Sequence, residues 1–228
     1  MIDLTTWNLT IATGVPAVTI STPLLVGGYQ DDYFKSDGGM IFFWAPVDGT
    51  TTENAIYPRS ELRETYANGQ LRNWTYPQAD NYLSATLKVT QVPSTGKVVI
   101  GQIHSYKSTW PLLKLQFEMQ SSGLAKLTAK IRNKPTDELS VSQTLLTNVP
   151  INQSFTYVVH LSPTGAMSIA FNGTKIFTRL DSAWAIKPLY FKAGAYPQDN
   201  TGYVSEAGAA TFSKLKIEHR ALAPVSPP

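Results

Sequence analysis

The 228-residue sequence contains no cysteine, which excludes disulfide bonds and thiolate chemistry. Charged residues make up only 15% of the chain, and the formal net charge of +3 is too small to indicate a nucleic-acid-binding protein. A weakly basic balance still permits an acidic polymer as partner where positive charge is concentrated locally. Local motifs, and not bulk charge, must therefore indicate the function.

Long apolar segments are also missing. No run approaches the ~20 residues that a membrane-spanning helix requires, and the first residues, MIDL, lack the basic start and apolar stretch of a signal peptide. We therefore expect a soluble protein without a membrane partner. It is either cytoplasmic, or secreted or periplasmic with its signal peptide removed.

Histidine is scarce as well. The three histidines, His104, His160 and His219, lie far apart in the sequence, and only His104 belongs to a polar motif. Metal sites usually bring several such ligands together at short spacings. We therefore predict no metal site and no other cofactor.

Helical periodicity is almost absent, and alternation of apolar and polar residues dominates. This pattern predicts half-buried strands at 83–89, 113–119, 125–131 and 155–161. Asn172-Gly173 is a strong signal for a two-residue hairpin, and 179–185 is the one segment that could form a short helix. No linker divides residues 1–220, so we predict one all-β domain followed by a disordered tail at 221–228. Many strands separated by turn residues favour a jelly-roll β-sandwich of two antiparallel sheets.

One predicted strand has a strongly basic polar face. Lys126, Lys130 and Arg132, together with Thr128, alternate with the apolar residues of 125–131. This face is either the wall of a binding groove or a solvated exterior, and we favour the exterior.

Three short segments carry most of the functional information: RSELR at 59–63, QIH at 102–104 and YFKAGAYPQ at 190–198. Side chains alternate between the faces of a strand. The side chains that share a face are therefore Arg59, Glu61 and Arg63 in the first segment, Gln102 and His104 in the second, and Tyr190, Lys192 and Tyr196 in the third. Together they would form a cationic, proton-transferring surface suited to an anionic substrate.

Each segment alone also has a simpler interpretation. The residues at 59–63 could be a surface ion network, which contributes little stability. A lone histidine is usually structural or exposed, and Tyr196 could be an aromatic strand end. Their joint occurrence on otherwise apolar strands favours a functional site.

The three segments, in this order, resemble the signature strands of the alginate lyases of polysaccharide lyase family 7. The similarity extends from DLTTWNL at 3–9 to ATFSKL at 210–215. It implies a jelly roll of two antiparallel sheets with a concave groove that binds alginate, a polymer of mannuronate and guluronate. Pro197 departs from the family pattern, since many members have asparagine there.

The resemblance implies roles for individual residues. The family's catalytic residues fall on Arg59, Gln102, His104 and Tyr196. Arg63, Lys192 and Gln198 fall on positions that line the groove, and we expect Glu61 and Tyr190, on the same strands, to bind substrate as well.

The implied reaction is β-elimination. Arg59 and Gln102, with His104 as a third donor when it is not the base, would neutralise the uronate carboxylate. Tyr196 would protonate the O4 leaving oxygen. The base would be His104 for guluronate and Tyr196 for mannuronate, and the second role needs Arg63 or Lys192 nearby to favour phenolate.

The resemblance also suggests a substrate preference and a mode of action. Isoleucine at position 103 accompanies acceptance of guluronate-containing blocks in the family, so we expect guluronate or mixed blocks to be preferred. We also expect a monomer that cleaves within chains and leaves an unsaturated uronate at the non-reducing end. The alternatives are a non-catalytic carbohydrate-binding module and a jelly-roll glycoside hydrolase, which would need two facing carboxylates.

Overall fold

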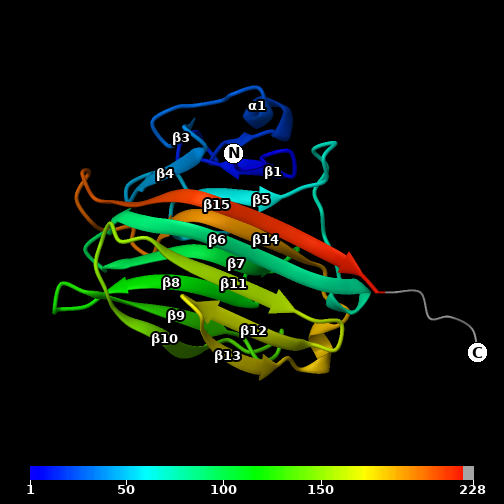
Figure 1. Cartoon of the computed structure of the whole chain (residues 1–228). Helices are drawn as coiled ribbons and strands as arrows, with labels where there is room; N and C mark the ends of the chain where they lie inside the picture. The colour runs from blue at the N-terminus through cyan, green and yellow to red at the C-terminus, as the bar shows by residue number, and fades with distance from the viewer. Residues whose placement is uncertain (223–228) are drawn as a thin grey trace, which may run out of the picture.

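The computed structural model describes residues 1–222, which form two antiparallel β-sheets packed face to face (Figure 1). The eight-stranded sheet contains, in spatial order, β10 (Val141–Val149), β9 (Ala125–Ile131), β8 (Leu113–Met119), β7 (Lys97–Ser105), β14 (Leu189–Pro197), β5 (Ser60–Glu64), β1 (Trp7–Thr10) and β2 (Thr19–Ile20). The seven-stranded sheet contains β13 (Thr174–Arg179), β12 (Ala166–Phe171), β11 (Phe155–Leu161), β6 (Ala79–Gln91), β15 (Ala207–Ala221), β4 (Met40–Pro46) and β3 (Phe34–Asp37). The predicted jelly-roll sandwich is confirmed.

The core lies between the sheets and is built from the apolar side of each alternating strand. Leu83 and Leu87 of β6 and Leu127 of β9 are almost completely buried. Phe117 of β8 and Phe155 of β11 stack across the interface with ring centroids 6.2 Å apart. Burial of such side chains stabilises a fold by roughly 1.5–3 kcal/mol each, so this interface holds the two sheets together.

Helical structure is limited to three short elements: α1 (Thr22–Val26) and the 3₁₀ turns η1 (Tyr76–Gln78) and η2 (Ser182–Trp184). The segment predicted to form a helix at 179–185 contains only η2. Asp181 caps this turn by accepting from the Ala183 N–H, and the buried Trp184 indole anchors it by donating to the Asn133 carbonyl. No helix among residues 1–222 is long and apolar enough to cross a membrane.

Two features predicted at turns and ends can be compared with the structure. Asn172 and Gly173 join β12 to β13 with φ angles of 46° and 87°, the positive values that two-residue hairpins favour, so the predicted hairpin is confirmed. The tail was predicted to begin at 221, but Ala221 still pairs with Ala79 in β15. Residues 223–228 of the predicted tail lie outside the described residues.

The topology brings the three sequence motifs together. β14 lies between β7 and β5, so segments from three distant parts of the chain become neighbours. Gly194 of β14 pairs with Glu61 of β5, and a Cβ at Gly194 would lie 2.4 Å from the Ser60 carbonyl oxygen. Only glycine permits this close approach of the two backbones.

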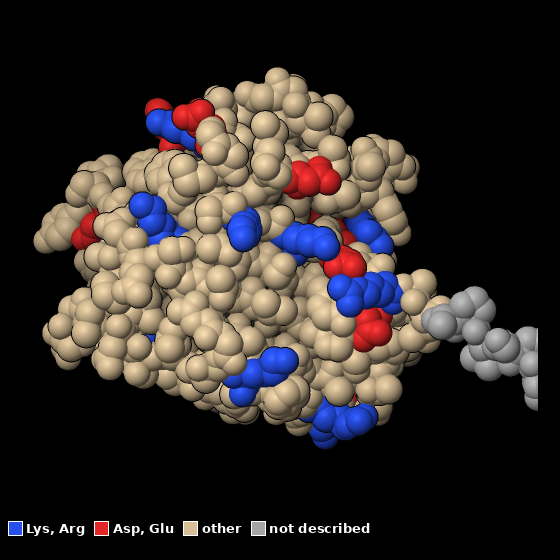
Figure 2. All heavy atoms as spheres, in the orientation of Figure 1, with Lys and Arg blue, Asp and Glu red and all other residues tan. Residues whose placement is uncertain are grey.

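Charge is dispersed on the side of the molecule formed by the seven-stranded sheet. Figure 2 views this side, on which Lys and Arg form separate patches and not a continuous basic area. Glu218 of β15 pairs with both Lys216 and Arg220 on this sheet. This face therefore lacks the concentrated positive charge that an acidic polymer would require.

Candidate active site

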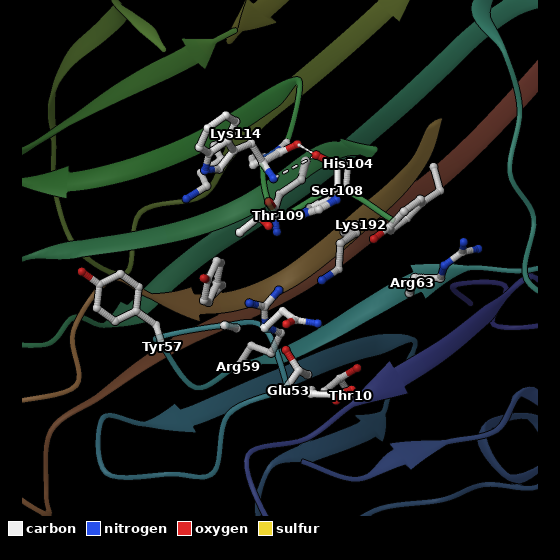
Figure 3. A pocket seen from close by; sticks show the side chains of 18 of the residues that line it. Thr10, Glu53, Tyr57, Arg59, Arg63, His104, Ser108, Thr109, Lys114 and Lys192 are labelled. Carbon is white, nitrogen blue, oxygen red and sulfur yellow. Dashed lines mark hydrogen bonds between the residues drawn. The ribbon is translucent and has the colours of Figure 1, made fainter. Parts of the chain in front are cut away.

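A groove of about 570 Å³ crosses the other face, which belongs to the eight-stranded sheet (Figure 3). Seven of the nine site residues predicted from the sequence line it: Arg59, Arg63, Gln102, His104, Tyr190, Lys192 and Tyr196. Glu61 and Gln198 do not line it. The groove also receives residues from the segments 52–57 and 108–111, which flank it on either side.

Strand register explains why these side chains meet. Lys192 of β14 pairs with Gln102 of β7 on one side and with Arg63 of β5 on the other. Tyr190 pairs with His104. Side chains that are directly opposite on neighbouring strands lie on the same face, so the polar residues of all three motifs face the groove.

Glu61 lies beneath this polar layer and has an exposed fraction of 0%. Its carboxylate accepts from three groups: Lys192 Nζ at 2.5 Å, Gln102 Nε2 at 2.5 Å and Arg59 Nη1 at 3.2 Å. The sequence predicted that Glu61 binds substrate. Its burial instead makes it the anion that holds three groove residues in position.

In this cluster the neighbouring charges counteract the effect of burial on the pKa of Glu61. Burial acts to raise the pKa of Glu61, but Lys192, Arg59 and the hydrogen bonds from Lys192 and Gln102 outweigh it and lower the pKa. Burial lowers the pKa of Lys192 to about 8. Repulsion from Arg59 and Arg63 lowers it further, and attraction to Glu61 raises it in part. Glu61 is therefore a fixed anion, and Lys192 stays a cation near neutral pH.

Arg59 and Arg63 differ in how many of their donors are free. Arg59 makes its one side-chain hydrogen bond with Glu61, and its buried Nε–H has no partner among the described residues. Arg63 donates to the carbonyls of Glu64 and Arg72 and to the side chain of Asn73. Arg59 thus retains donors for a ligand, whereas Arg63 is held largely by the protein.

Each arginine also stacks on a tyrosine. The Arg59 guanidinium lies 3.9 Å from the ring centroid of Tyr196, and that of Arg63 lies 4.0 Å from the centroid of Tyr190. The sequence-based mechanism expected Arg63 or Lys192 to act on the Tyr196 phenol. The stacking partner is instead Arg59, because Arg59 precedes β5 beside Tyr196 and Arg63 lies two strand positions beyond Glu61.

His104 has a defined tautomer. Nδ1 lies 2.9 Å from the Ser105 carbonyl, which can only accept, so Nδ1 carries the proton and Nε2 has a free lone pair. Burial, with Lys192 and Arg59 nearby, lowers the pKa of His104 to about 3. His104 is therefore a neutral imidazole with a free acceptor at Nε2, and the expectation that it also donates to the carboxylate does not fit this geometry.

Tyr196 retains its proton. Burial raises the pKa of Tyr196, and Arg59 opposes this only in part. The free protein therefore presents a neutral phenol and a neutral imidazole in the same groove. This combination suits a general acid acting with a general base.

Gln198 lies at the end of β14 and supports the site indirectly. Its Oε1 accepts from Lys114 Nζ at 3.1 Å, and its Nε2 donates to the Tyr196 carbonyl at 3.3 Å. Pro197, where the family pattern often has asparagine, still belongs to β14 and pairs with Val98. The departure at this position therefore leaves the strand intact.

The sequence missed several groove residues, above all Lys114. Lys114 belongs to the polar face of β8, and Arg132 follows β9; both line the groove. The basic face of 125–131, which we favoured as exterior, is therefore on the groove side of the sheet. Pairing of β9 with β8 causes this, because Lys130 lies directly opposite Lys114. Tyr57 and Trp110 come from flanking loops and gave no signal in the pattern.

The alternatives of a metal site and a hydrolase can now be examined. Among residues 1–222 no group of three or more His, Cys, Asp and Glu side chains is arranged to hold a metal. Glu53 is the described carboxylate that lines the groove. Glu64 faces the core, where it accepts from the Trp74 indole and the Phe191 N–H. The described carboxylates thus do not form the facing pair that a glycoside hydrolase needs.

A sandwich with a cationic groove that holds a neutral imidazole and a neutral phenol, and no facing carboxylates among the described residues, fits a lyase for acidic polysaccharides. The family model described as alginate lyase matches residues 2–219. The chain belongs to this family, and it is a polysaccharide lyase.

Similar proteins agree with this assignment. A solved alginate lyase from Pseudomonas aeruginosa is 45% identical, with a TM-score of 0.93 over 96% of this chain and 100% of that one. The alginate lyase A1-II′, a member of polysaccharide lyase family 7, is 29% identical with a TM-score of 0.85 over 97% of each chain. A curated alginate lyase from Klebsiella pneumoniae is 28% identical over 96% of this chain and 90% of its own length. Variants of A1-II′ have been solved with a product (GGG) and a substrate (GGMG).

Proposed function

We propose that this lyase cleaves alginate within its chains by β-elimination, with preference for guluronate-containing or mixed blocks. The observation that carries the proposal is that one groove contains both a neutral His104, whose Nε2 is free, and a protonated Tyr196. The C5 proton and O4 of guluronate lie on opposite sides of the sugar. A separate base and acid therefore suit guluronate better than mannuronate.

The substrate carboxylate must be neutralised before the C5 proton can leave. Arg59 offers unpaired donors, and Gln102 retains one N–H because Glu61 accepts the other. Lys192 adds a positive charge between them. Preorganised donors of this kind typically contribute about 10²- to 10³-fold to the rate for each donor.

The proton transfers then follow from the protonation states. His104 Nε2 takes the C5 proton, and the electrons of the C5–H bond form the C4=C5 double bond. The C4–O4 bond breaks, and the Tyr196 hydroxyl donates its proton to O4. The products are a chain with a new free end and an oligosaccharide with an unsaturated uronate at its non-reducing end.

The A1-II′ complexes support the choice of these two residues. In the substrate complex of that enzyme a histidine is replaced by asparagine and a tyrosine by phenylalanine, and in the product complex a tyrosine is replaced by phenylalanine. These are the residue types of His104 and Tyr196.

Two further points concern specificity and mode of action. Ile103 is fully buried in the core, so its side chain does not contact the sugar, and any effect on block preference is indirect. The groove is lined from Thr19 of β2, across β1, β5, β14, β7 and β8, to Arg132 beyond β9. A groove across so many strands supports internal cleavage by a single protein chain.

Product analysis tests the proposal. The protein is incubated with polyguluronate, polymannuronate and alternating alginate, and the products are followed by ultraviolet absorbance and mass spectrometry. We expect unsaturated oligosaccharides of several lengths early in the reaction, fastest from guluronate-containing polymers, at a rate that a chelator leaves unchanged. Single unsaturated monomers from the start would contradict internal cleavage. Faster release from polymannuronate would contradict the block preference.

A further inference from the structure

The strand pair β8–β9 contains two charged cross-strand pairs of opposite character. Glu118 lies opposite Lys126, and their side chains form an ion pair at 3.5 Å. Four residues along the same face, Lys114 lies opposite Lys130. One end of this face is therefore charge-balanced, and the end near the catalytic residues is not.

Like charges that are directly opposite on neighbouring strands destabilise a sheet. Neither Lys114 nor Lys130 forms an ion pair with any described carboxylate, since the ion pairs made by the carboxylates of this sheet involve other residues. Burial and then Lys130 lower the pKa of Lys114. Burial also lowers the pKa of Lys130, although Glu118 opposes it. The two lysines therefore repel each other, and nearby carboxylates offset this repulsion only in part.

Arg132 adds a third positive charge on this side. Its guanidinium lies 4.8 Å from the ring centroid of Trp110, and its Nε donates to the Pro111 carbonyl. These contacts hold Arg132 at the groove wall, where Lys114 also lies. The opposite end of the groove is lined by the neutral side chains of Asn8, Thr10 and Thr19. Positive charge thus extends from Arg63 through Lys192 to Lys114 and Arg132, and the residues that β1 and β2 contribute to the groove are neutral.

We propose that Lys114, Lys130 and Arg132, here called the β8–β9 arm, bind the carboxylate of a uronate unit next to the one held by Arg59 and Gln102. The inference rests on the proposed function, because it assumes a polyuronate in the groove. β9 lies two strand spacings from β7, about 10 Å. Lys130 is therefore too far from the catalytic residues to contact the same sugar, whereas Lys114 of β8 pairs with Gln102, lies 5.6 Å from the Tyr196 ring centroid and links the catalytic residues to the rest of the arm. A bound carboxylate would relieve the repulsion between the two lysines.

The arm makes binding depend on chain length. A polymer reaches both the catalytic residues and the arm, whereas a short oligosaccharide bound at the catalytic residues need not extend to it. Loss of one charge in the arm should therefore weaken binding of the polymer more than that of a trisaccharide. It should also reduce the salt dependence of KM, because fewer charges then contribute to attraction that salt screens.

The test compares Lys130→Ala with Lys126→Ala. Both variants remove one lysine from the same face of β9, but Lys126 is already paired with Glu118. For Lys130→Ala we expect KM on polymeric alginate to rise roughly 3- to 10-fold, as for loss of one hydrogen bond of typical net strength. KM on a trisaccharide should change less than twofold, and Lys130→Arg should restore the polymer KM. Lys126→Ala should leave both KM values near those of the wild type.

Stability separates binding from misfolding. Because Lys130→Ala removes a repulsion, its Tm should not fall below that of the wild type. Equal KM changes in the two variants, or equal changes on polymer and trisaccharide, would overturn the arm as a separate subsite. Absence of unsaturated product from the wild type would instead overturn the proposed function, so the two failures are distinguishable.

Discussion

Glu61 and Lys192 form a buried ion pair directly below the groove, with 2.5 Å between Oε2 and Nζ. Both side chains are almost completely buried, and Glu61 also accepts from Arg59 and Gln102. A buried pair of this kind contributes little net stability compared with apolar packing, but removing one partner is costly. The Glu61 carboxylate instead serves to orient three side chains that line the groove, those of Lys192, Arg59 and Gln102.

The first prediction concerns this carboxylate. Glu61→Gln leaves Lys192 and Arg59 close together without an anion, so the free energy of unfolding should fall by about 3–5 kcal/mol. Glu61 raises the pKa of Lys192, so the fall of kcat/KM at alkaline pH should move to lower pH in this variant. Urea denaturation and a pH–rate profile measure the two effects.

Two other variants show whether charge is the cause. Glu61→Asp keeps the anion and should recover part of both effects, whereas Glu53→Gln removes the exposed carboxylate at the groove wall and should keep wild-type stability. An unshifted alkaline limb in a folded Glu61→Gln protein would argue against the positioning role.

The second prediction concerns the general acid. Tyr196→Phe removes the proton donor but keeps the ring against which Arg59 stacks, so the fold and substrate binding should survive. We expect kcat to fall by about 10²- to 10⁴-fold on every block type, with a much smaller change in the Kd for oligosaccharide. Tyr203→Phe, at an exposed tyrosine, is the control. Near-normal turnover by folded Tyr196→Phe would exclude Tyr196 as the acid.

Much of this fold could be predicted from the sequence. Alternation identified the strands around β6, β8, β9 and β11, because each has one face in the core. Asn172-Gly173 identified a hairpin, because few residue pairs adopt two positive φ angles readily. These are local properties, so a single sequence reveals them.

The arrangement of the site was less predictable. Alternation showed that Glu61 shares a face with Arg59 and Arg63, but it could not show that Glu61 lies below the layer that contacts solvent. It also could not show that Lys130 lies on the same face of the sheet as the groove-lining Lys114, which follows from the pairing of β9 with β8. Strand pairing between distant segments depends on the whole fold, and the resemblance to a known family supplied what the local pattern lacked.

The third prediction separates His104 from Tyr196. His104 has a free lone pair at Nε2 and no proton to donate there, so it should act as base and not as carboxylate ligand. His104→Ala should therefore reduce the rate on polyguluronate by about 10²- to 10⁴-fold and that on polymannuronate by a smaller factor. The ratio of the two rates, measured by ultraviolet absorbance, is the readout.

The matched control for this substitution is His160→Ala. His160 stacks on Tyr82 of the seven-stranded sheet, away from the groove, so its loss should leave the ratio of the two rates unchanged. Equal proportional losses on both homopolymers in folded His104→Ala would show that one base serves both epimers.

The last prediction uses the lysines of the groove to relate stability to pH. Burial lowers the pKa of Lys114 to about 8, below its usual value of about 10.4 in an unfolded chain. Between these two values the unfolded chain binds more protons than the folded protein, so the free energy of unfolding rises with pH in this window. The variant Lys114→Met lacks this titration. Its free energy of unfolding should therefore exceed that of the wild type at pH 7, by a margin that shrinks as pH rises from about 8 to about 10.4. Over the same window wild-type kcat/KM should fall, because Lys114 and Lys192 lose the charges that attract the substrate. Denaturation of both proteins across this range measures the margin, and a margin independent of pH would show that Lys114 is not a buried cation in the free protein.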